Sequence, residues 1–461
     1  MKCSLVKYRL LLAAFGIVLQ FHPVTGLGAG PLPDAALVQN LSAYYPNLSC
    51  TALAAKSQFG GEGFKFLRTE IPWYWDQLKK DPTQLLTSSQ QEKFRNFLGF
   101  CAGDAHPENF AIQTTSTGQP IFAINDRDDA TENCPVLADF LRFLVAAKLS
   151  GRPVDATALT QTYLAALQAK PGSAEDSFIP ADFLTSGLPA IQTEDDDAAP
   201  APGDKTKGYC DEKQLASLTQ VLASVLKVDA AKIKFKGQDK SHDSGNGKVK
   251  GCKTEIKTTG GSGGVIRYEV KYSVAGVEQP KMEFKSTQAA GPTFYTGQAA
   301  PTEQRYQLAC QLEAQKSDCR LTKMGDLTFL LRVKDRNDRA VSLDPTKDQQ
   351  GKEQLANILH NETVVLARLH RSNLTQGTAA DYAQSLKSME QNPKNSLAAL
   401  ASRVAQRAQE AAAHLKKISP SDFVNQCEAS RSLLQIPSGT APAAVSGAAS
   451  GSGGSNARGV K

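Results

Sequence analysis

Apolar residues recur at three- and four-residue spacing over much of the chain, and this periodicity predicts a large helical part. We expect helices at residues 35–45, 90–98, 136–147, 157–168, 215–226, 302–315 and 353–372, with two more between 379 and 417. In the helix at 136–147, Asp139 is a lone acid and Arg142 lies three residues on, at the spacing of a same-face pair.

Alternation of apolar and polar residues indicates strands in the middle of the chain. Residues 265–274 read V-I-R-Y-E-V-K-Y-S-V, and the segment 279–285 returns after a short turn as a second strand. A further strand is expected at 327–334, and a hairpin is expected from 110–113 and 121–124 around a polar turn. Helices and antiparallel hairpins in separate stretches predict an α+β fold.

The hairpin at 110–124 joins two polar clusters, G-D-A-H-P-E-N-F before it and N-D-R-D-D after it. Because a hairpin brings its ends together, we expect its polar residues to converge: Asp104, His106, Asn109, Asn125, Asp126 and Asp128. Such oxygen ligands suit Mg²⁺, which leaves coordination positions for substrate phosphates. Asp104 is the better candidate base, and His106 either shares that role or holds the loop. The alternative is a polar hairpin satisfied by hydrogen bonds within its own loops.

A glycine-rich turn, T-T-G-G-S-G-G, precedes the strand at 265–274. Its backbone amides could cradle a phosphate, and Lys285 near the end of the next strand would add a positive charge. The cofactor-binding candidates are therefore Gly260, Gly261, Ser262, Gly263, Gly264 and Lys285, together with Arg68, whose guanidinium can hold a phosphate bidentately. A solvated loop and a structural ion pair of Arg68 are the alternatives.

Residues 1–26 have a positive start and a short apolar stretch, which predicts a secretory signal peptide and an exported, periplasmic or secreted protein. After cleavage of such a signal, no stable transmembrane segment is expected. The net charge is +6, but five of the positive residues lie in the leader and the C-terminal tail, so the remainder carries about +1. This charge does not predict a nucleic-acid partner.

Eight cysteines remain when Cys3 in the leader is set aside, and an even number after export indicates disulfides. Cys310 and Cys319 form the simplest local pair. Cys101 and Cys134 flank the polar hairpin. They either form a disulfide that staples the hairpin or remain buried thiols.

Asp104 and Asn109 have the D-x-x-x-x-N spacing of a kinase catalytic loop, and Asp126 fits a second metal ligand from a separate strand end. The loop G-D-A-H-P-E-N resembles that of aminoglycoside-phosphotransferase-like enzymes, and I-N-D-R-D-D resembles their metal-binding segment. More broadly, the chain resembles the bacterial family called domain of unknown function 2252. The motifs that carry this resemblance are F-K-F-L-R, G-D-A-H-P-E-N-F, N-D-R-D-D, G-G-S-G-G-V-I-R-Y, M-E-F-K, L-L-R-V-K-D and L-A-R-L-H-R-S.

The kinase resemblance implies a helical lobe and a small antiparallel-sheet lobe. The glycine turn and Lys285 follow the catalytic loop, whereas in ordinary kinases they precede it, so the fold is expected to be circularly permuted. Glu303 could pair with Lys285, while Arg127 and Ser286 depart from the family's usual residues. The expected parts are a signal peptide (1–26), a catalytic-loop and helical part (27–190), a linker (191–208), a glycine-loop hairpin lobe (209–345), C-terminal helices (346–436) and a disordered tail (437–461).

The implied activity is a Mg²⁺-dependent transfer of a phosphoryl group from ATP or another nucleotide to a small-molecule or peptidic acceptor. Two alternatives remain: a non-catalytic kinase-like protein of the cell envelope that binds a ligand or partner, and a metal-dependent phosphohydrolase.

Overall fold

The computed structural model describes residues 34–46, 48–59, 62–80, 86–115, 117–170, 179, 183–184, 207–237, 249, 251–256, 265–287, 290–297, 306, 310, 319–325, 327–333, 339–341, 343 and 352–434. The predicted leader, most of the predicted linker, the glycine turn at 260–264, Glu303 and the predicted tail lie outside these residues.

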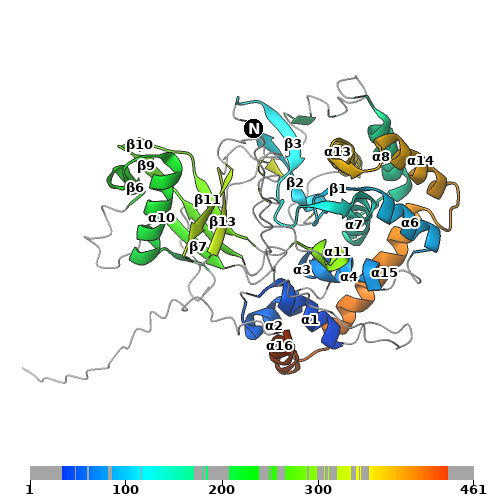
Figure 1. Ribbon diagram of the computed structural model, residues 1–461, viewed down its shortest axis with the longest axis horizontal. Helices are drawn as coiled ribbons and strands as arrows, with labels where there is room; N and C mark the ends of the chain where they lie inside the picture. Colours follow the sequence, from blue (N-terminus) through cyan, green and yellow to red (C-terminus); the bar gives the residue numbers. More distant parts are fainter. Residues whose placement is uncertain are drawn as a thin grey trace, which may run out of the picture. The chain divides into compact units, whose positions relative to one another are not determined.

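Helices make up most of the described residues before 170 and after 350 (Figure 1). They are α1 (Asp34–Tyr44), α2 (Cys50–Phe59), α3 (Gly63–Thr69), α4 (Ile71–Lys80), α6 (Ser88–Asn96), α7 (Val136–Leu149), α8 (Ala156–Gln168), α13 (Lys352–Ser372), α14 (Ala379–Glu390), α15 (Leu397–Leu415) and α16 (Pro420–Leu434). Helix α7 is buried from Val136 to Ala147, and α15 and α3 pack against it. The periodicity did not predict helices α2 to α4 and α16. The glycines near residue 60 lie between the end of α2 and the start of α3.

Two small antiparallel sheets lie within this helical part. One has the order β15 (Leu374–Gln376), β1 (Leu98–Cys101), β4 (Thr131–Pro135), and the other has the order β14 (Arg339–Ala340), β2 (Phe110–Thr114), β3 (Pro120–Ile124). Strands β2 and β3 pair from Phe110 with Ile124 to Thr114 with Pro120, so the predicted central hairpin is confirmed. A short 3-10 helix, η1 (Pro107–Asn109), leads into it.

The middle of the chain forms a six-stranded antiparallel sheet. Its order is β12 (Arg320–Met324), β13 (Leu327–Val333), β11 (Met282–Ser286), β8 (Ile266–Val270), β7 (Cys252–Ile256), β5 (Lys207–Tyr209). Helix α10 (Glu212–Leu226) lies against this sheet (Figure 1), and its leucines share a core with Phe284, Tyr268 and Leu331. The opposite face of β11 carries Glu283 and Lys285, since successive side chains alternate.

The expected single strand at 265–274 is interrupted at Lys271. There the backbone N–H of Lys271 donates to Gly251 and its carbonyl accepts from Lys236. The chain therefore leaves the large sheet after β8 and enters a three-stranded sheet of order β10 (Val277–Glu278), β9 (Tyr272–Val274), β6 (Ile233–Phe235). Two short helices, η3 (Ala230–Lys232) and α11 (Thr293–Thr296), complete the described elements, and the fold is α+β.

Four disulfides account for the eight cysteines after the leader: Cys50–Cys427, Cys101–Cys134, Cys210–Cys252 and Cys310–Cys319. The predicted local pair Cys310–Cys319 is confirmed. Of the two alternatives for Cys101 and Cys134, the staple is the correct one, and it joins β1 to β4 on either side of the central hairpin.

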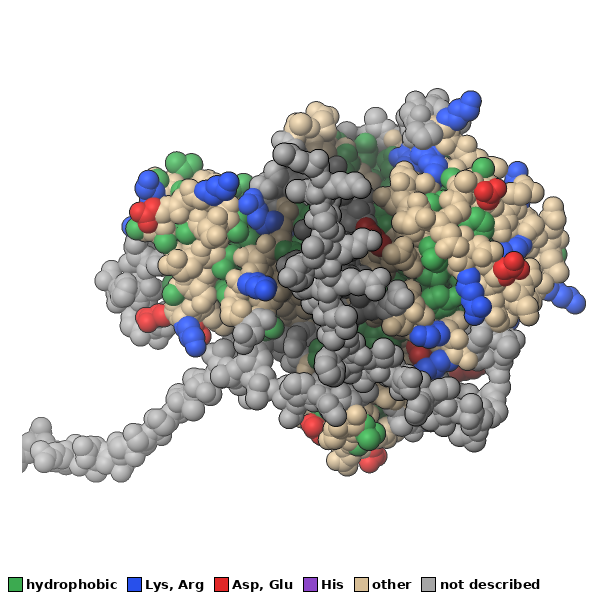
Figure 2. All heavy atoms as spheres, in the orientation of Figure 1, with side chains coloured by type: hydrophobic (Ala, Val, Ile, Leu, Met, Phe, Trp, Pro, Cys, Tyr) green, Lys and Arg blue, Asp and Glu red, His purple; other side chains and the backbone are tan. Residues whose placement is uncertain are grey.

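Within the described ranges, no helix has the length and apolar character needed to cross a membrane. On the face drawn in Figure 2, the described lysine and arginine side chains are spread out and do not gather in one patch.

Candidate functional site

Hydrogen bonds between neighbouring side chains and its backbone hold the loop between β1 and β2 in place. Gly103 has a positive φ of 79°, and a Cβ at this position would overlap the Asp129 carbonyl. Only glycine fits there. The buried Asp139 of α7 accepts hydrogen bonds from Ala102 N (2.8 Å) and Gly103 N (2.9 Å), and Trp75 Nε1 donates to Gly103 O at 2.9 Å. The loop that carries Asp104 is therefore fixed from two sides.

Asp104 forms a buried ion pair with Arg142 of α7. Arg142 Nε donates to Asp104 Oδ1 at 3.2 Å, Nη2 contacts the same oxygen, and Nη2 also donates to Leu67 O at 2.9 Å. Burial alone would raise the pKa of Asp104, but Arg142 and His106 outweigh it and hold the pKa well below its usual range. Asp104 is therefore an anion at neutral pH and a weak base.

His106 lies on the other side of Asp104, with Nε2 at 3.4 Å from Asp104 Oδ2. Burial lowers the pKa of His106 despite the neighbouring carboxylate, so the ring is neutral at pH 7. Its Nδ1 is buried and accepts no hydrogen bond from the described part of the chain. His106 thus supports the Asp104 carboxylate and keeps one ring nitrogen available.

Asn109 joins the two polar clusters. Its Nδ2 donates to the carbonyls of Asp104 (3.1 Å) and Asp126 (2.9 Å). Because carbonyls only accept, these two bonds set the orientation of the amide and direct Oδ1 away from them. Asn109 therefore links the backbones of Asp104 and Asp126 across the two ends of the hairpin, and these two bonds do not use its Oδ1.

Asp126 and Asp128 meet Lys285 of β11. Lys285 Nζ is 2.7 Å from Asp126 Oδ2 and 3.0 Å from Asp126 Oδ1, and it also contacts Asp128 Oδ2. Burial acts to raise the pKa of Asp126, but Lys285 and Arg332 hold it well below its usual range. Burial and the neighbouring Asp126 carboxylate instead raise the pKa of Asp128 to about 6. Asp126 therefore stays ionised through the acidic range, whereas Asp128 takes up a proton as the pH falls towards 6.

The next acid, Asp129, faces the protein interior. Its Oδ1 accepts hydrogen bonds from the Tyr44 hydroxyl and from Gly291 N, the latter at 2.8 Å. Burial and the nearby Asp104 carboxylate raise its pKa to about 7. Asp129 thus ties the loop to α1 and to the segment before α11.

The polar face of the large sheet completes the surroundings of Asp126. Arg332 of β13 donates from Nη1 to Asn125 O (2.8 Å) and from Nη2 to Glu283 Oε1 (3.2 Å). Glu283 is fully buried. This chain of contacts links β11 and β13 to the N-D-R-D-D segment.

The oxygen donors near Asp126 suit Mg²⁺ only together with ligands from outside the protein. Among the described residues, no group of three or more His, Cys, Asp or Glu side chains could hold a metal ion. Asn109 Oδ1 and the carboxylates of Asp126 and Asp128 are hard oxygen donors, and the Asp126 side chain is the most exposed of the site's acids, at 27%. This set fits an ion that brings phosphates and waters with it, as Mg²⁺ does, and not a cage made by the protein alone.

Arg68, the glycine turn and Glu303 are the predicted residues that remain. Arg68 forms an ion pair with Glu108, whose other oxygen accepts from Leu343 N at 2.9 Å, and the Arg68 guanidinium also lies over Phe64. The glycine turn at 260–264 and Glu303 lie outside the described residues.

Two residues depart from the pattern expected by resemblance. Ser286 Oγ accepts a hydrogen bond from Ile266 N at 2.9 Å and so ties β11 to the start of β8. Arg127 is buried, at 5% exposed. Ser286 therefore has a structural partner in the strand that follows the glycine turn.

The sequence did not predict that Arg142 and Tyr44 contact acids of the site. It predicted from their spacing that Asp139 and Arg142 lie on the same face of their helix. The two have separate partners, since Asp139 binds backbone amides and His370 Nε2 (3.1 Å) while Arg142 binds Asp104. The one available signal was an arginine on an otherwise apolar helix, because a buried arginine requires an anion.

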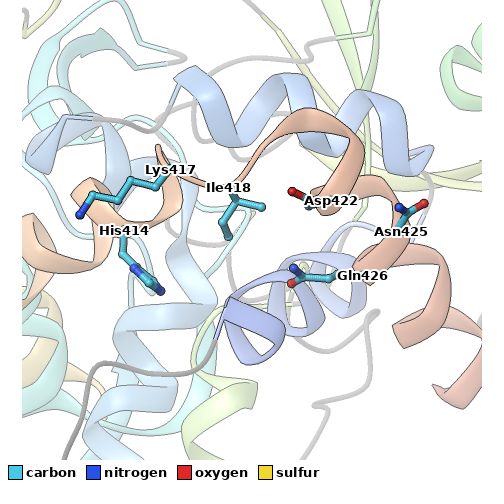
Figure 3. Close-up of a pocket in the computed structure, with 6 residues that line it drawn as sticks. All are labelled: His414, Lys417, Ile418, Asp422, Asn425 and Gln426. Atoms are coloured by element: carbon cyan, nitrogen blue, oxygen red, sulfur yellow. The ribbon is translucent and has the colours of Figure 1, made fainter.

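A cavity of about 290 Å³ lies elsewhere, at the junction of α15 and α16 (Figure 3). The residues that line it are His414, Lys417, Ile418, Asp422, Asn425 and Gln426. None of the predicted site residues belongs to it.

A family model described as "Uncharacterized protein conserved in bacteria (DUF2252)" matches residues 64–169. This match supports the family resemblance. It includes three of the motifs that carry the resemblance, F-K-F-L-R, G-D-A-H-P-E-N-F and N-D-R-D-D, and ends before the large sheet begins. No curated protein and no solved structure matches the chain.

Proposed function

We propose that the protein is a Mg²⁺-dependent phosphotransferase that moves a phosphoryl group from a nucleotide to a small-molecule or peptidic acceptor. One observation carries the proposal. Asn109 binds the backbones of both Asp104 and Asp126, and Lys285 binds the side chain of Asp126, so the four residues meet at one place. A base, two metal-binding side chains and a lysine are the parts that phosphoryl transfer requires.

The Asp104 carboxylate would accept a hydrogen bond from the hydroxyl group of the acceptor substrate. Its low pKa makes it a poor base in the ground state, so it orients the hydroxyl and takes the proton only as the new O–P bond forms and the bond to the leaving phosphate breaks. Arg142 keeps the carboxylate ionised and fixed, and His106 contacts its second oxygen. Most of the rate enhancement would come from positioning and charge neutralisation.

Asn109, Asp126 and Asp128 would hold Mg²⁺, which neutralises charge that develops on the phosphate oxygens. Lys285 shares the Asp126 and Asp128 carboxylates in the described structure, so its ammonium is already close to where phosphates would lie. A kinase lysine has the same task, on the strand that follows a glycine-rich loop. Here β8 and β11 follow the catalytic loop in sequence, which supports a permuted order.

We further propose that the protein acts outside the cytoplasm. Four disulfides support this, because structural disulfides are formed and kept in oxidising compartments.

The test is Mg²⁺-dependent nucleotide binding, measured by thermal shift with ATP, followed by a turnover assay. Asp104→Ala should lower turnover by about 10²- to 10⁴-fold and leave most of the binding. Asp126→Asn should remove the dependence on Mg²⁺, and Glu428→Gln, which changes an exposed acid on α16, should match the unmodified protein. Normal transfer by both site variants would refute the assignment.

A second function, ligand binding without turnover, is favoured by a specific observation. Both catalytic-type acids are engaged by buried cations, Asp104 by Arg142 and Asp126 by Lys285. Under this alternative, MgATP would shift the melting temperature but no phosphate would leave ATP. Release of inorganic phosphate without an acceptor would indicate the phosphohydrolase instead.

A further inference from the structure

Arg267 is a buried cation within the motif G-G-S-G-G-V-I-R-Y, and it has no part in the catalytic roles above. It is the second residue of β8, directly opposite Lys285 of β11 in the sheet register. Side chains directly opposite each other in an antiparallel pair lie on the same face. Arg267 therefore lies on the polar face that meets Asp126.

Within the described part of the chain, the Nε of Arg267 is left without a hydrogen-bond partner. Arg267 is only 9% exposed, and its ion-pair contact is Nε to Glu283 Oε1 at 3.8 Å, beyond hydrogen-bond distance. Glu283 gives its closer contact, 3.2 Å, to Arg332. A buried N–H donor without an acceptor is costly, and an anion bound to the guanidinium would satisfy it.

The charges around Arg267 also favour an anionic ligand at this face. Arg267, Lys285 and Arg332 are three cations on this face, and Glu283, Asp126 and Asp128 are three acids that contact one or more of them. The charges of these six residues balance. Mg²⁺ bound to Asp126 would add two positive charges, and the cations would then need several negative charges from the ligand.

We propose that Arg267 and Lys285 together form a binding site for a linear phosphate chain. The ligand class is a polyphosphate bound with Mg²⁺, and a nucleoside triphosphate and inorganic tripolyphosphate both carry that chain. Arg267 would hold one phosphate bidentately, which suits its planar guanidinium, while Lys285 contacts another as a point charge. This inference rests on the proposed function, because it assigns the phosphate donor of the same site.

The test compares the binding of MgATP and of Mg-tripolyphosphate by calorimetry in the full chain and three variants. Arg267→Gln should raise the Kd for each ligand that the unmodified protein binds by about 10- to 100-fold, the loss expected for a charge-assisted hydrogen-bonded contact. Arg267→Lys should restore part of the affinity. Lys323→Gln, which removes an exposed charge from β12 of the same sheet, should leave the Kd unchanged.

The melting temperature, without and with ligand, gives a second measurement. Because Arg267 faces the buried Glu283, its removal leaves part of the local negative charge uncompensated, so ligand-free Arg267→Gln should melt below the unmodified protein. Saturating MgATP should raise the melting temperature of the unmodified protein by more than that of the variant, and an equal rise in both would overturn the inference.

The outcomes separate the two proposals. If the unmodified protein binds either ligand and Arg267→Gln binds it equally well, the inference fails and the proposed function stands. If the unmodified protein binds neither ligand, the proposed function fails and the inference fails with it. If the unmodified protein binds both ligands, it recognises the phosphate chain. If it binds MgATP alone, it also requires the nucleoside. In each case, a loss of affinity in Arg267→Gln supports the inference.

Discussion

Lys285 Nζ lies 2.7 Å from Asp126 Oδ2, although the two residues are 159 positions apart in the sequence. The lysine is 1% exposed, and its strand belongs to the large sheet, whereas Asp126 follows the central hairpin. This contact joins the two parts of the chain that carry the proposed chemistry.

Removal of Lys285 should destabilise the fold. Lys285→Met leaves Asp126 and Asp128 without their buried cation, and breaking such a pair from one side typically costs about 3–5 kcal/mol. The double variant Lys285→Met/Asp126→Asn should recover part of that loss, because no uncompensated charge remains at position 126. Urea unfolding at pH 7 measures both. Equal stability of the single and double variants would contradict a strong coupling between the two residues.

The Asp104–Arg142 pair should make stability depend on acid pH. The folded pKa of Asp104 is lowered, so the carboxylate stabilises the protein above its unfolded pKa of about 4, and the effect is lost as pH falls towards the folded pKa. Asp104→Asn should therefore be less stable than the unmodified protein at pH 7, and the difference should shrink below pH 4. A difference that stays constant from pH 7 to pH 3 would show that charge is not its cause.

Asp129 should have the opposite dependence. Its folded pKa is raised to about 7, so the folded state retains a proton that the unfolded state has already lost, and stability falls as pH rises from about 4 to 7. Asp129→Asn keeps an oxygen for Tyr44 and Gly291 but cannot ionise. At pH 8 it should be more stable than the unmodified protein by up to ~4 kcal/mol, with little difference at pH 4. Thermal melting across this pH range provides the measurement.

The Cys101–Cys134 disulfide should support the catalytic loop, because Cys101 immediately precedes Ala102 and Gly103. Replacing both cysteines by alanine should cost about 2–4 kcal/mol and lower any phosphate transfer. The matched control is Cys310→Ala/Cys319→Ala, whose disulfide closes a separation of 9 residues instead of 33. The control should cost less stability because its loop is shorter, and equal loss of transfer in both double variants would argue against a specific role of the staple.

The sequence predicted those parts of the site that depend on near neighbours. The hairpin at 110–124 is set by two short apolar runs and a polar turn, and it brings Asn109 to Asp126 as expected. The local disulfide Cys310–Cys319 and the α+β class were predicted for the same reason. The strand at 265–274 was only partly right, because alternation continues through Lys271 while the hydrogen bonds pass to another sheet.

The charge partners could not be predicted in this way. Asp139 and Arg142 are three residues apart on one helix, yet one binds loop amides and the other binds Asp104. Arg68 has the composition of a phosphate ligand and pairs with Glu108. Which ion finds which partner depends on the direction of each side chain across packed elements, and neither spacing nor composition records that direction.

Local patterns were enough to predict the helices with clear periodicity, the central hairpin and the short spacing that places Asp104 and Asn109 on one loop. Packing of distant segments makes Arg142 neutralise Asp104, brings Lys285 to both Asp126 and Asp128, and buries Arg267. Backbone conformation follows from adjacent residues, whereas a buried charge is satisfied by whichever group the fold brings within a few ångströms.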